Sequence, residues 1–199
     1  MSLALRLREA LETGSRRAPI LIAGDVLDEE AGAIGVTPAA VLVPVVDRPE
    51  PSVILTLRPM TMRKHPGQIS FPGGRIDPGD DGPIGAALRE AEEEIGLPRH
   101  AVEVIGIADR YRTITGFEVT PVIGIVPPDL PLAPHPGEVE ALFEAPLFYL
   151  LDPARQAVRT VEWRGRERSF YEIEFEGRRI WGATAAMIVN LSRRLALAA

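Results

Sequence analysis

The sequence predicts an α/β fold in which helices flank a mixed β-sheet, in a single domain over residues 1–199. The first supporting observation is that β-branched segments bounded by Pro, Gly or Asp recur along the chain. The second is that segments with apolar residues at helical spacing are interspersed irregularly among them. The third is that the chain has no internal repeat and no long linker, at a length that suits one buried core. Such a mixture places helices on the faces of one sheet.

The first predicted element is an amphipathic helix within residues 1–17. Its apolar residues fall on one stripe of a helix, at Leu3, Leu7, Ala10 and Leu11. Charged residues interrupt the apolar run and no small-residue cleavage site follows, so a secretory signal peptide is not expected. No uncharged stretch approaches the length needed to cross a bilayer. We therefore expect a cytoplasmic protein that has no membrane partner.

Two β-branched segments, 38–47 and 52–58, are predicted to be strands. The short connection between them, residues 48–51, is expected to form a tight hairpin turn. Residues 68–71 are predicted to form a short strand that leads into a Gly-Gly turn.

The clearest helical pattern covers residues 83–95. Its apolar face, with i, i+3, i+4 and i+7 spacing, consists of Ile84, Ala87, Leu88 and Ala91. Pro83 suits the first turn and Asp81 lies near the N-cap. Gly96 and then Pro98 are predicted to end the helix.

The second half of the chain is predicted to add three strands and a helix. Strands are expected at 102–111 and 117–126, and Pro121 indicates that the second lies at a sheet edge or beside a bulge. A proline-rich loop follows at 127–137, and clean alternation predicts a strand at 171–175. The last predicted element is a helix at 181–197 that turns Met187, Ile188, Leu191 and Leu195 inward.

Composition and charge exclude several classes of function. The formal net charge of −6 argues against bulk nucleic-acid binding, which normally needs an excess of basic residues. The chain has no cysteine, so disulfides, thiolate zinc sites and cysteine nucleophiles are excluded. A small-molecule substrate is the expected partner, and the sequence leaves open whether the chain is a monomer or a homodimer.

Acidic residues are crowded near the end of the helix predicted at 83–95. Positions i, i+3 and i+4 share a helix face, so Glu90, Glu93 and Glu94 are expected to project together. Neighbouring like charges destabilise a helix by roughly a few tenths of a kcal/mol per pair, which a bound cation would offset. Three carboxylates form a hard oxygen site suited to Mg²⁺ or Mn²⁺. The alternative is a solvated acidic helix face.

Residues beside these glutamates favour a metal site. Gly73 and Gly74 precede the helix, where a carbonyl oxygen could reach an ion because no side chain intervenes. Arg89 could brace the carboxylates for a reaction, or it could form a purely structural ion pair.

Gly74 together with the segment REAEEEIGL (89–97) resembles the signature of the Nudix hydrolases. That signature is a glycine, five residues, a glutamate, seven residues and then Arg-Glu-apolar-x-Glu-Glu-x-Gly-apolar, and its second half matches at every fixed position. In the first half, Asp80 replaces the glutamate, and eight residues instead of seven separate it from Arg89. The resemblance implies a Nudix-type α/β/α sandwich, with residues 65–97 as its loop and helix. It also implies hydrolysis of a nucleoside diphosphate linked to another group.

The upstream segment 54–74 resembles the additional motif of the coenzyme A diphosphatase branch of this family. The matching residues are Ile54, Leu55, Thr56, Arg58, Arg63, Gly67, Phe71, Pro72, Gly73 and Gly74. Pro59 stands where the motif has Ser or Ala, and segments 114–124 and 180–185 also resemble the branch. This implies cleavage of coenzyme A or a derivative into adenosine 3',5'-bisphosphate and 4'-phosphopantetheine. The alternatives are a hydrolase of ADP-ribose, NADH or an oxidised nucleotide, and a Nudix-fold sensor that binds a nucleotide without cleaving it.

The resemblance also implies roles for individual residues. Those expected at the metal ion, Mg²⁺ or Mn²⁺, are Gly74, Glu90, Glu93 and Glu94. Those expected to be catalytic are Glu93, Glu90 and Arg89. Those expected to bind substrate are Arg58, Arg63, Gly67 and Phe71, although the last could belong to the core. Glu138, just after the proline-rich loop, is a further candidate for a metal ligand or a catalytic base.

Overall fold

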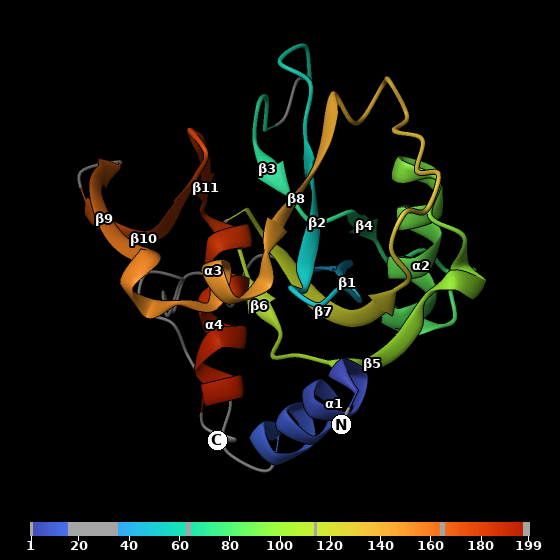
Figure 1. Cartoon of the computed structure of the whole chain (residues 1–199). Coiled ribbons are helices and arrows are strands. Elements are labelled where there is room, and N and C mark those ends of the chain that lie inside the picture. The colour runs from blue at the N-terminus through green and yellow to red at the C-terminus, as the bar shows by residue number, and fades with distance from the viewer. Residues whose placement is uncertain (1, 16–35, 63–64, 114, 164–165, 197–199) are drawn as a thin grey trace.

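The computed structural model describes the chain except for residues 1, 16–35, 63–64, 114, 164–165 and 197–199. Figure 1 shows a large sheet in the middle of the molecule, helices on both of its sides and a smaller sheet beside it. Within the described parts of the chain, no helix combines the length and the apolar character that crossing a bilayer requires.

The elements have the following bounds. The large sheet contains β1 (Thr37–Val46), β2 (Ser52–Leu57), β3 (Ile69–Ser70), β4 (Gly73–Arg75), β5 (Glu103–Ile107), β6 (Tyr111–Arg112), β7 (Phe117–Val126) and β8 (Ala141–Pro146). The small sheet contains β9 (Gln156–Trp163), β10 (Arg166–Phe175) and β11 (Arg178–Trp181). The helices are α1 (Leu3–Ser15), α2 (Gly82–Ile95), α3 (Leu147–Leu151) and α4 (Ala183–Ala196), with short 3-10 turns at Arg99–Ala101 and Pro153–Arg155.

The large sheet is mixed, as the sequence predicted. Its strand order is β3-β2-β1-β7-β5, with β4 attached to β1, β6 to β7 and β8 to β2. β1 and β7 run parallel along their whole lengths, whereas the other neighbouring strands of this sheet are antiparallel. The predicted hairpin between the first two strands is confirmed, with Val45 opposite Val53.

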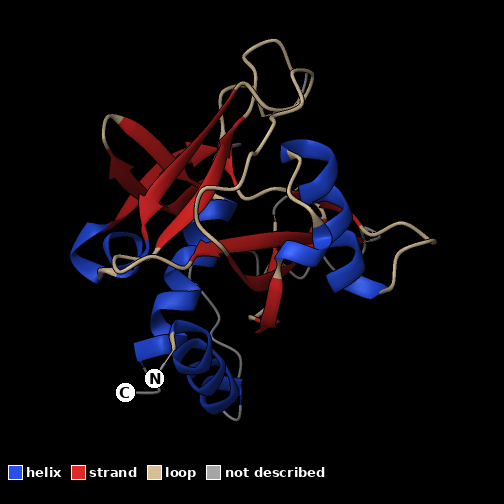
Figure 2. Cartoon of the chain, turned by 45° about the vertical axis from the view of Figure 1, so that its right-hand side comes forward, coloured by secondary structure: helices blue, strands red, loops and turns tan. Residues whose placement is uncertain are grey.

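Alternate residues of β1 point to opposite faces of the sheet and enter two separate cores. Leu42 packs with the apolar face of α2, which includes Ala91 and Ile95. Val43, the next residue, belongs to the core that α1 and α4 cover. In Figure 1, α2 lies to one side of the large sheet and α4 to the other, and Figure 2 gives the arrangement from a second direction. The layers are therefore helix, sheet and helix.

Of the two alternatives predicted for the strand that contains Pro121, the sheet edge is wrong, because β7 lies between β1 and the strands β5 and β6, whereas an irregularity in the neighbouring strand is present. Proline is tolerated there because of where the neighbouring strand is interrupted. The Pro121 carbonyl accepts a hydrogen bond from Ala108 N–H, in the gap between β5 and β6. The amide nitrogen of a strand residue points to the same side as its carbonyl, so the missing N–H of Pro121 falls at this gap. A register shift between Val104 and Gly106 adds an irregularity to the same neighbour.

β8, α3, β9 and β11 were not predicted from the sequence, and the Gly-Gly pair expected to form a turn belongs instead to the strand β4. The C-terminal helix begins later than predicted. Residues 178–181 form β11, paired with β10 through Ile180 opposite Ile173, and α4 begins only at Ala183. Gly182, with a positive φ of 63°, separates the strand from the helix. The inward face of α4 is as predicted, with Met187, Ile188 and Leu191 buried and Leu195 packed against them.

Helix α2 begins and ends close to the predicted residues. Asp81 is the N-cap residue, although its side chain accepts no capping hydrogen bond, and Pro83 lies in the first turn. Gly96 ends the helix in the left-handed conformation, with φ of 66°, and its N–H returns to the Glu92 carbonyl. These local signals fix the position of the acidic residues along the chain.

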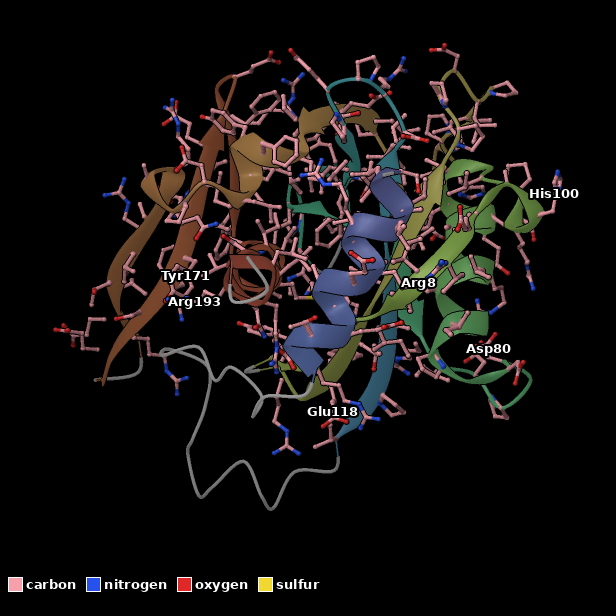
Figure 3. The ribbon with its side chains drawn as sticks, turned by 60° about the horizontal axis from the view of Figure 1, so that its bottom comes forward. Arg8, Asp80, His100, Glu118, Tyr171 and Arg193 are labelled. Atoms are coloured by element: carbon pink, nitrogen blue, oxygen red, sulfur yellow. The ribbon has the colours of Figure 1, made fainter. Side chains whose placement is uncertain are left out.

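A buried ion pair ties the first and last helices to the sheet. The Arg194 guanidinium on α4 is 4% exposed, pairs with Asp109 between β5 and β6, and donates to the Gly14 carbonyl on α1. By contrast, Arg8 on α1 pairs with Glu103 on β5 at 3.2 Å in an exposed position (Figure 3). The two pairs differ mainly in burial.

We expect Arg194→Met to destabilise the protein by about 3 kcal/mol, because it leaves the Asp109 carboxylate covered and without its cation. Arg8→Ala is the matched control and should cost about 1 kcal/mol or less, because exposed ion pairs contribute little. Urea unfolding followed by circular dichroism measures both changes. Equal losses in the two variants would contradict a special contribution from the buried pair.

Candidate active site

Glu94 is a buried carboxylate on the sheet-facing side of α2. It is 4% exposed, and its Oε2 atom accepts a hydrogen bond of 3.1 Å from the Gly73 N–H in β4. The Nη1 atom of Arg58, just after β2, lies 4.0 Å from Glu94 Oε1. Burial raises the pKa of Glu94 to about 7, although the Gly73 hydrogen bond and the Arg58 charge oppose the shift.

Glu90 lies one helical turn earlier and is pressed against the backbone of Gly74. A Cβ atom at residue 74 would lie 2.5 Å from the Glu90 carboxyl carbon, so any residue other than glycine would displace the carboxylate from this position. Burial raises the pKa of Glu90, and the hydrogen bond from Arg89 opposes that shift. The backbone of β4 therefore meets both carboxylates directly, at Gly73 and at Gly74.

Arg89 is the centre of an ion-pair network at the start of this site. Its Nε and Nη2 atoms donate to the two carboxylate oxygens of Asp80 at 2.8 and 3.0 Å. Its Nη1 atom donates to Glu90 at 2.9 Å and to Glu93 at 3.0 Å, and Nη2 also reaches the Arg75 carbonyl. Of the two interpretations of Arg89 from the sequence, the ion-pair role is the one the contacts display. The same contacts give Asp80 a definite place, as the partner that holds Arg89.

The structure corrects the expectation that Glu90, Glu93 and Glu94 converge. Glu93 has a side chain 58% exposed, and it turns towards Arg89, which precedes it by one helical turn. Among the described residues, no three acidic or histidine side chains surround one point closely enough to be counted as a metal-holding group. A shared helix face brings side chains to the same side, but in the described part of the chain the exposed Glu93 is hydrogen-bonded to Arg89 and forms no such group with Glu90 and Glu94.

Glu138 is the acidic residue that tertiary structure adds near Glu90 and Glu94. The proline-rich loop is bonded to the end of α2, because Ala133 N–H donates to the Ile95 carbonyl at 2.9 Å and His135 N–H to the Glu94 carbonyl at 2.8 Å. The negative charge of Glu138 contributes to the raised pKa of both Glu90 and Glu94. Glu138 is exposed, and the proline-rich loop holds it beside the site.

The residues expected at the substrate have different positions. Arg58 is 24% exposed in its side chain, and its buried Nε atom has no hydrogen-bond partner among the described residues. Gly67 has a positive φ of 65° and its N–H donates to the Arg58 carbonyl at 3.2 Å, so it closes the intervening loop. Phe71 is 3% exposed within the core, which leaves it little surface for a ligand. Arg63 lies outside the described residues.

A model of the NUDIX domain matches residues 36–164, which is more than half of the chain. The chain belongs to the Nudix hydrolase family. It is therefore an enzyme of the class that hydrolyses nucleoside diphosphate derivatives, on a Nudix-type α/β fold.

Named relatives are similar over most of the length of this Nudix hydrolase. "Uncharacterized Nudix hydrolase NudL" of Cronobacter sakazakii is 46% identical over 157 residues, which cover 79% of this chain and 82% of that protein. The protein of the same name from Escherichia coli (strain K12) is 45% identical over the same shares of the two chains. Among solved structures, the Nudix hydrolase RenU from M. smegmatis has a TM-score of 0.49 and 26% identity, covering 58% of this chain and 73% of that chain.

Nudix hydrolases generally use divalent metal ions, and the groups at this site suit one. The oxygen atoms of Glu90 and Glu94, together with the Gly73–Gly74 backbone, form the hard donor set that Mg²⁺ and Mn²⁺ prefer. Glu94 is buried and its carboxylate accepts a single hydrogen bond from the described part of the chain, whereas a buried charge normally has fuller compensation. The fit therefore rests on Glu90 and Glu94, with Glu138 close to both.

The Asp80–Arg89 pair predicts a specific pH dependence of stability. Hydrogen bonds from Arg89 lower the pKa of Asp80 from 3.8 to about 2, so the ionised form is favoured in the folded protein. This stabilisation is present above pH 3.8 and is lost as the pH falls towards 2. Asp80 lies in the loop before α2 (Figure 3), so a substitution at this position leaves Glu90 and Glu94 themselves in the chain.

We expect Asp80→Asn to be less stable than the unmodified protein at neutral pH, because Arg89 loses its carboxylate partner. The difference in the free energy of unfolding should be constant above about pH 5 and should shrink as Asp80 of the unmodified protein becomes protonated. Urea titrations of both proteins between pH 3 and 7 measure this difference. A difference that does not vary over this range would contradict the assigned ion pair.

Proposed function

We propose that this Nudix hydrolase cleaves the diphosphate bond of coenzyme A and its derivatives, with Mg²⁺ or Mn²⁺ as cofactor. The products would be adenosine 3',5'-bisphosphate and 4'-phosphopantetheine. The proposal is supported by the resemblance of segment 54–74 to the motif of the coenzyme A diphosphatase branch. In the fold, this segment forms β2, the following loop, β3 and the start of β4, and so leads directly to Glu94.

The single observation that carries the proposal is the position of Arg58. Its guanidinium is largely buried beside Glu94, and its Nε atom lacks a hydrogen-bond partner among the described residues. A buried guanidinium with free donors is costly unless an anion accepts from it. A phosphate oxygen of the substrate is such an acceptor, because guanidinium groups pair with phosphates through charge-assisted hydrogen bonds. Arg63 of the same motif is proposed to bind a phosphate as well.

Glu90 and Glu94 are proposed to hold the ion, together with the Gly74 carbonyl. When bound, a divalent ion neutralises the charge of the diphosphate and makes a water molecule more acidic. Arg89 positions Glu90 through the hydrogen bond of 2.9 Å between them. Glu138 is proposed to accept the proton of the attacking water, since the proline-rich loop holds it beside both ligands. Glu93 is proposed as an additional ligand, a role that requires it to leave its hydrogen bond with Arg89.

A substrate panel tests the proposed specificity. Purified protein with Mg²⁺ or Mn²⁺ is offered coenzyme A, dephospho-coenzyme A, ADP-ribose, NADH and an oxidised nucleoside triphosphate. We expect kcat/KM to be greatest for coenzyme A and activity to disappear in the presence of a chelator. A higher value for another compound would assign the enzyme to that substrate, and metal-bound protein without turnover on any of them would indicate a nucleotide sensor.

Two glutamates of α2 provide a matched test of the metal ligands. Glu94→Gln removes a charge from the buried carboxylate and is expected to reduce kcat by at least about a hundredfold, because ligand charge contributes several kcal/mol to such catalysis. Glu92→Gln is the control, since Glu92 is on the same helix but pairs with Arg99 at 2.7 Å, away from Glu94. Circular dichroism checks that both variants are folded. Unchanged turnover in Glu94→Gln would refute the ligand assignment.

A further inference from the structure

Arg58 lies beside Glu94, so its guanidinium can interact either with the Glu94 carboxylate or with an anionic substrate, and a bound cation would interact with the same carboxylate. Its Nη1 atom lies 4.0 Å from Glu94 Oε1, which is too long for a hydrogen bond but close enough for strong Coulombic attraction. The guanidinium thus acts as a counter-charge to Glu94 without being locked to it. Arg89, a second cation among the described residues of the site, is instead held by several hydrogen bonds.

The backbone around Arg58 is fixed, so only its side chain is free to change partner. Arg58 N–H donates to the Gln68 carbonyl at 2.9 Å, and Gly67 N–H donates to the Arg58 carbonyl at 3.2 Å. Glu94 is fixed on the other side by its position on α2 and by the Gly73 N–H. The Arg58 side chain therefore lies between the fixed Glu94 carboxylate and the solvent-facing part of the site, and it is 24% exposed.

We propose that Arg58 couples metal binding to substrate binding by exchanging partners. In the free protein its positive charge compensates Glu94 and opposes the entry of a divalent ion. Once Glu94 is neutralised by such an ion, the Arg58 guanidinium is released to pair with a phosphate of the diphosphate substrate. This inference rests on the proposed metal and diphosphate site, but it holds for any nucleoside diphosphate derivative.

The other charges facing Glu94 agree with this assignment. Glu90 and Glu138 are both negative and increase the attraction for a cation, while the Gly73 N–H is neutral. Among the described residues, Arg58 therefore supplies the positive charge near Glu94, and a substitution of Arg58 alone tests the effect of that charge. By Coulomb's law, one positive charge about 6 Å from a divalent ion changes affinity by about tenfold even with the screening of bulk water.

The test is the binding of Mn²⁺ alone, measured by isothermal titration calorimetry without substrate. We expect Arg58→Gln to bind Mn²⁺ about tenfold more tightly than the unmodified protein, because the opposing charge is gone. Arg58→Lys keeps the charge and should remain within about threefold of the unmodified protein. Arg8→Gln, which removes an arginine from the exposed pair with Glu103, is the control and should leave Mn²⁺ affinity unchanged.

Substrate kinetics test the second step of the proposed exchange, in which Arg58 pairs with a phosphate of the substrate. The KM for coenzyme A should rise about tenfold or more in Arg58→Gln, because a phosphate loses its charged partner. Mn²⁺ affinity that is unchanged or weaker in Arg58→Gln would overturn the coupling, even if coenzyme A is hydrolysed by the unmodified protein. Absence of Mn²⁺ binding to the unmodified protein would overturn the metal-dependent function itself, which is a separate result. Thermal unfolding of each variant verifies that affinities refer to folded protein.

Discussion

The burial of the Glu94 carboxylate against the Gly73 N–H is the constraint on which the site depends. A charged group that is 4% exposed requires compensation, and the described residues supply one hydrogen bond and one cation at 4.0 Å. The neighbouring glycine, Gly74, is needed because the Glu90 carboxylate occupies the space of a side chain. Together these contacts place two carboxylates against the backbone of β4, where no side chain intervenes, and the chemistry proposed for this enzyme follows from that placement.

Repulsion among the glutamates of α2 is relieved because different arginines lie beside them. Arg89 takes Glu90 and Glu93, and Asp80 in turn holds Arg89 through two hydrogen bonds. Glu92 has its own exposed pair with Arg99. Only Glu94 is left without a hydrogen bond from a charged side chain among the described residues, and it is also the most buried of the four. The helix thus places at one position, next to Arg58, a carboxylate that charged side chains of the described residues do not hold by a hydrogen bond.

Packing of the loops against α2 completes the arrangement. Hydrogen bonds from Ala133 and His135 to the last turn of α2 hold the proline-rich loop in place, and Glu138 is carried with it to the site. On the other side, β2 and β3 are paired through Thr56 and Ser70, which fixes the ends of the loop that begins at Arg58. Both loops are attached to regular elements at each end, so groups from separate parts of the chain meet around one carboxylate.

The sequence by itself determined the first hairpin, the bounds of α2, the inward face of α4 and the identity of the acidic segment, because these depend on local periodicity, caps and turns. Tertiary structure decided the rest. Pro121 fits within a central strand because its neighbour is interrupted there, and Glu93 faces Arg89 because a guanidinium competes for it. Glu138 was already a candidate from its position after the proline-rich loop, but no local pattern could predict that it approaches Glu94. That approach depends on hydrogen bonds between residues about forty positions apart along the chain. Such contacts follow from the packing of the whole fold, and no local sequence preference encodes them.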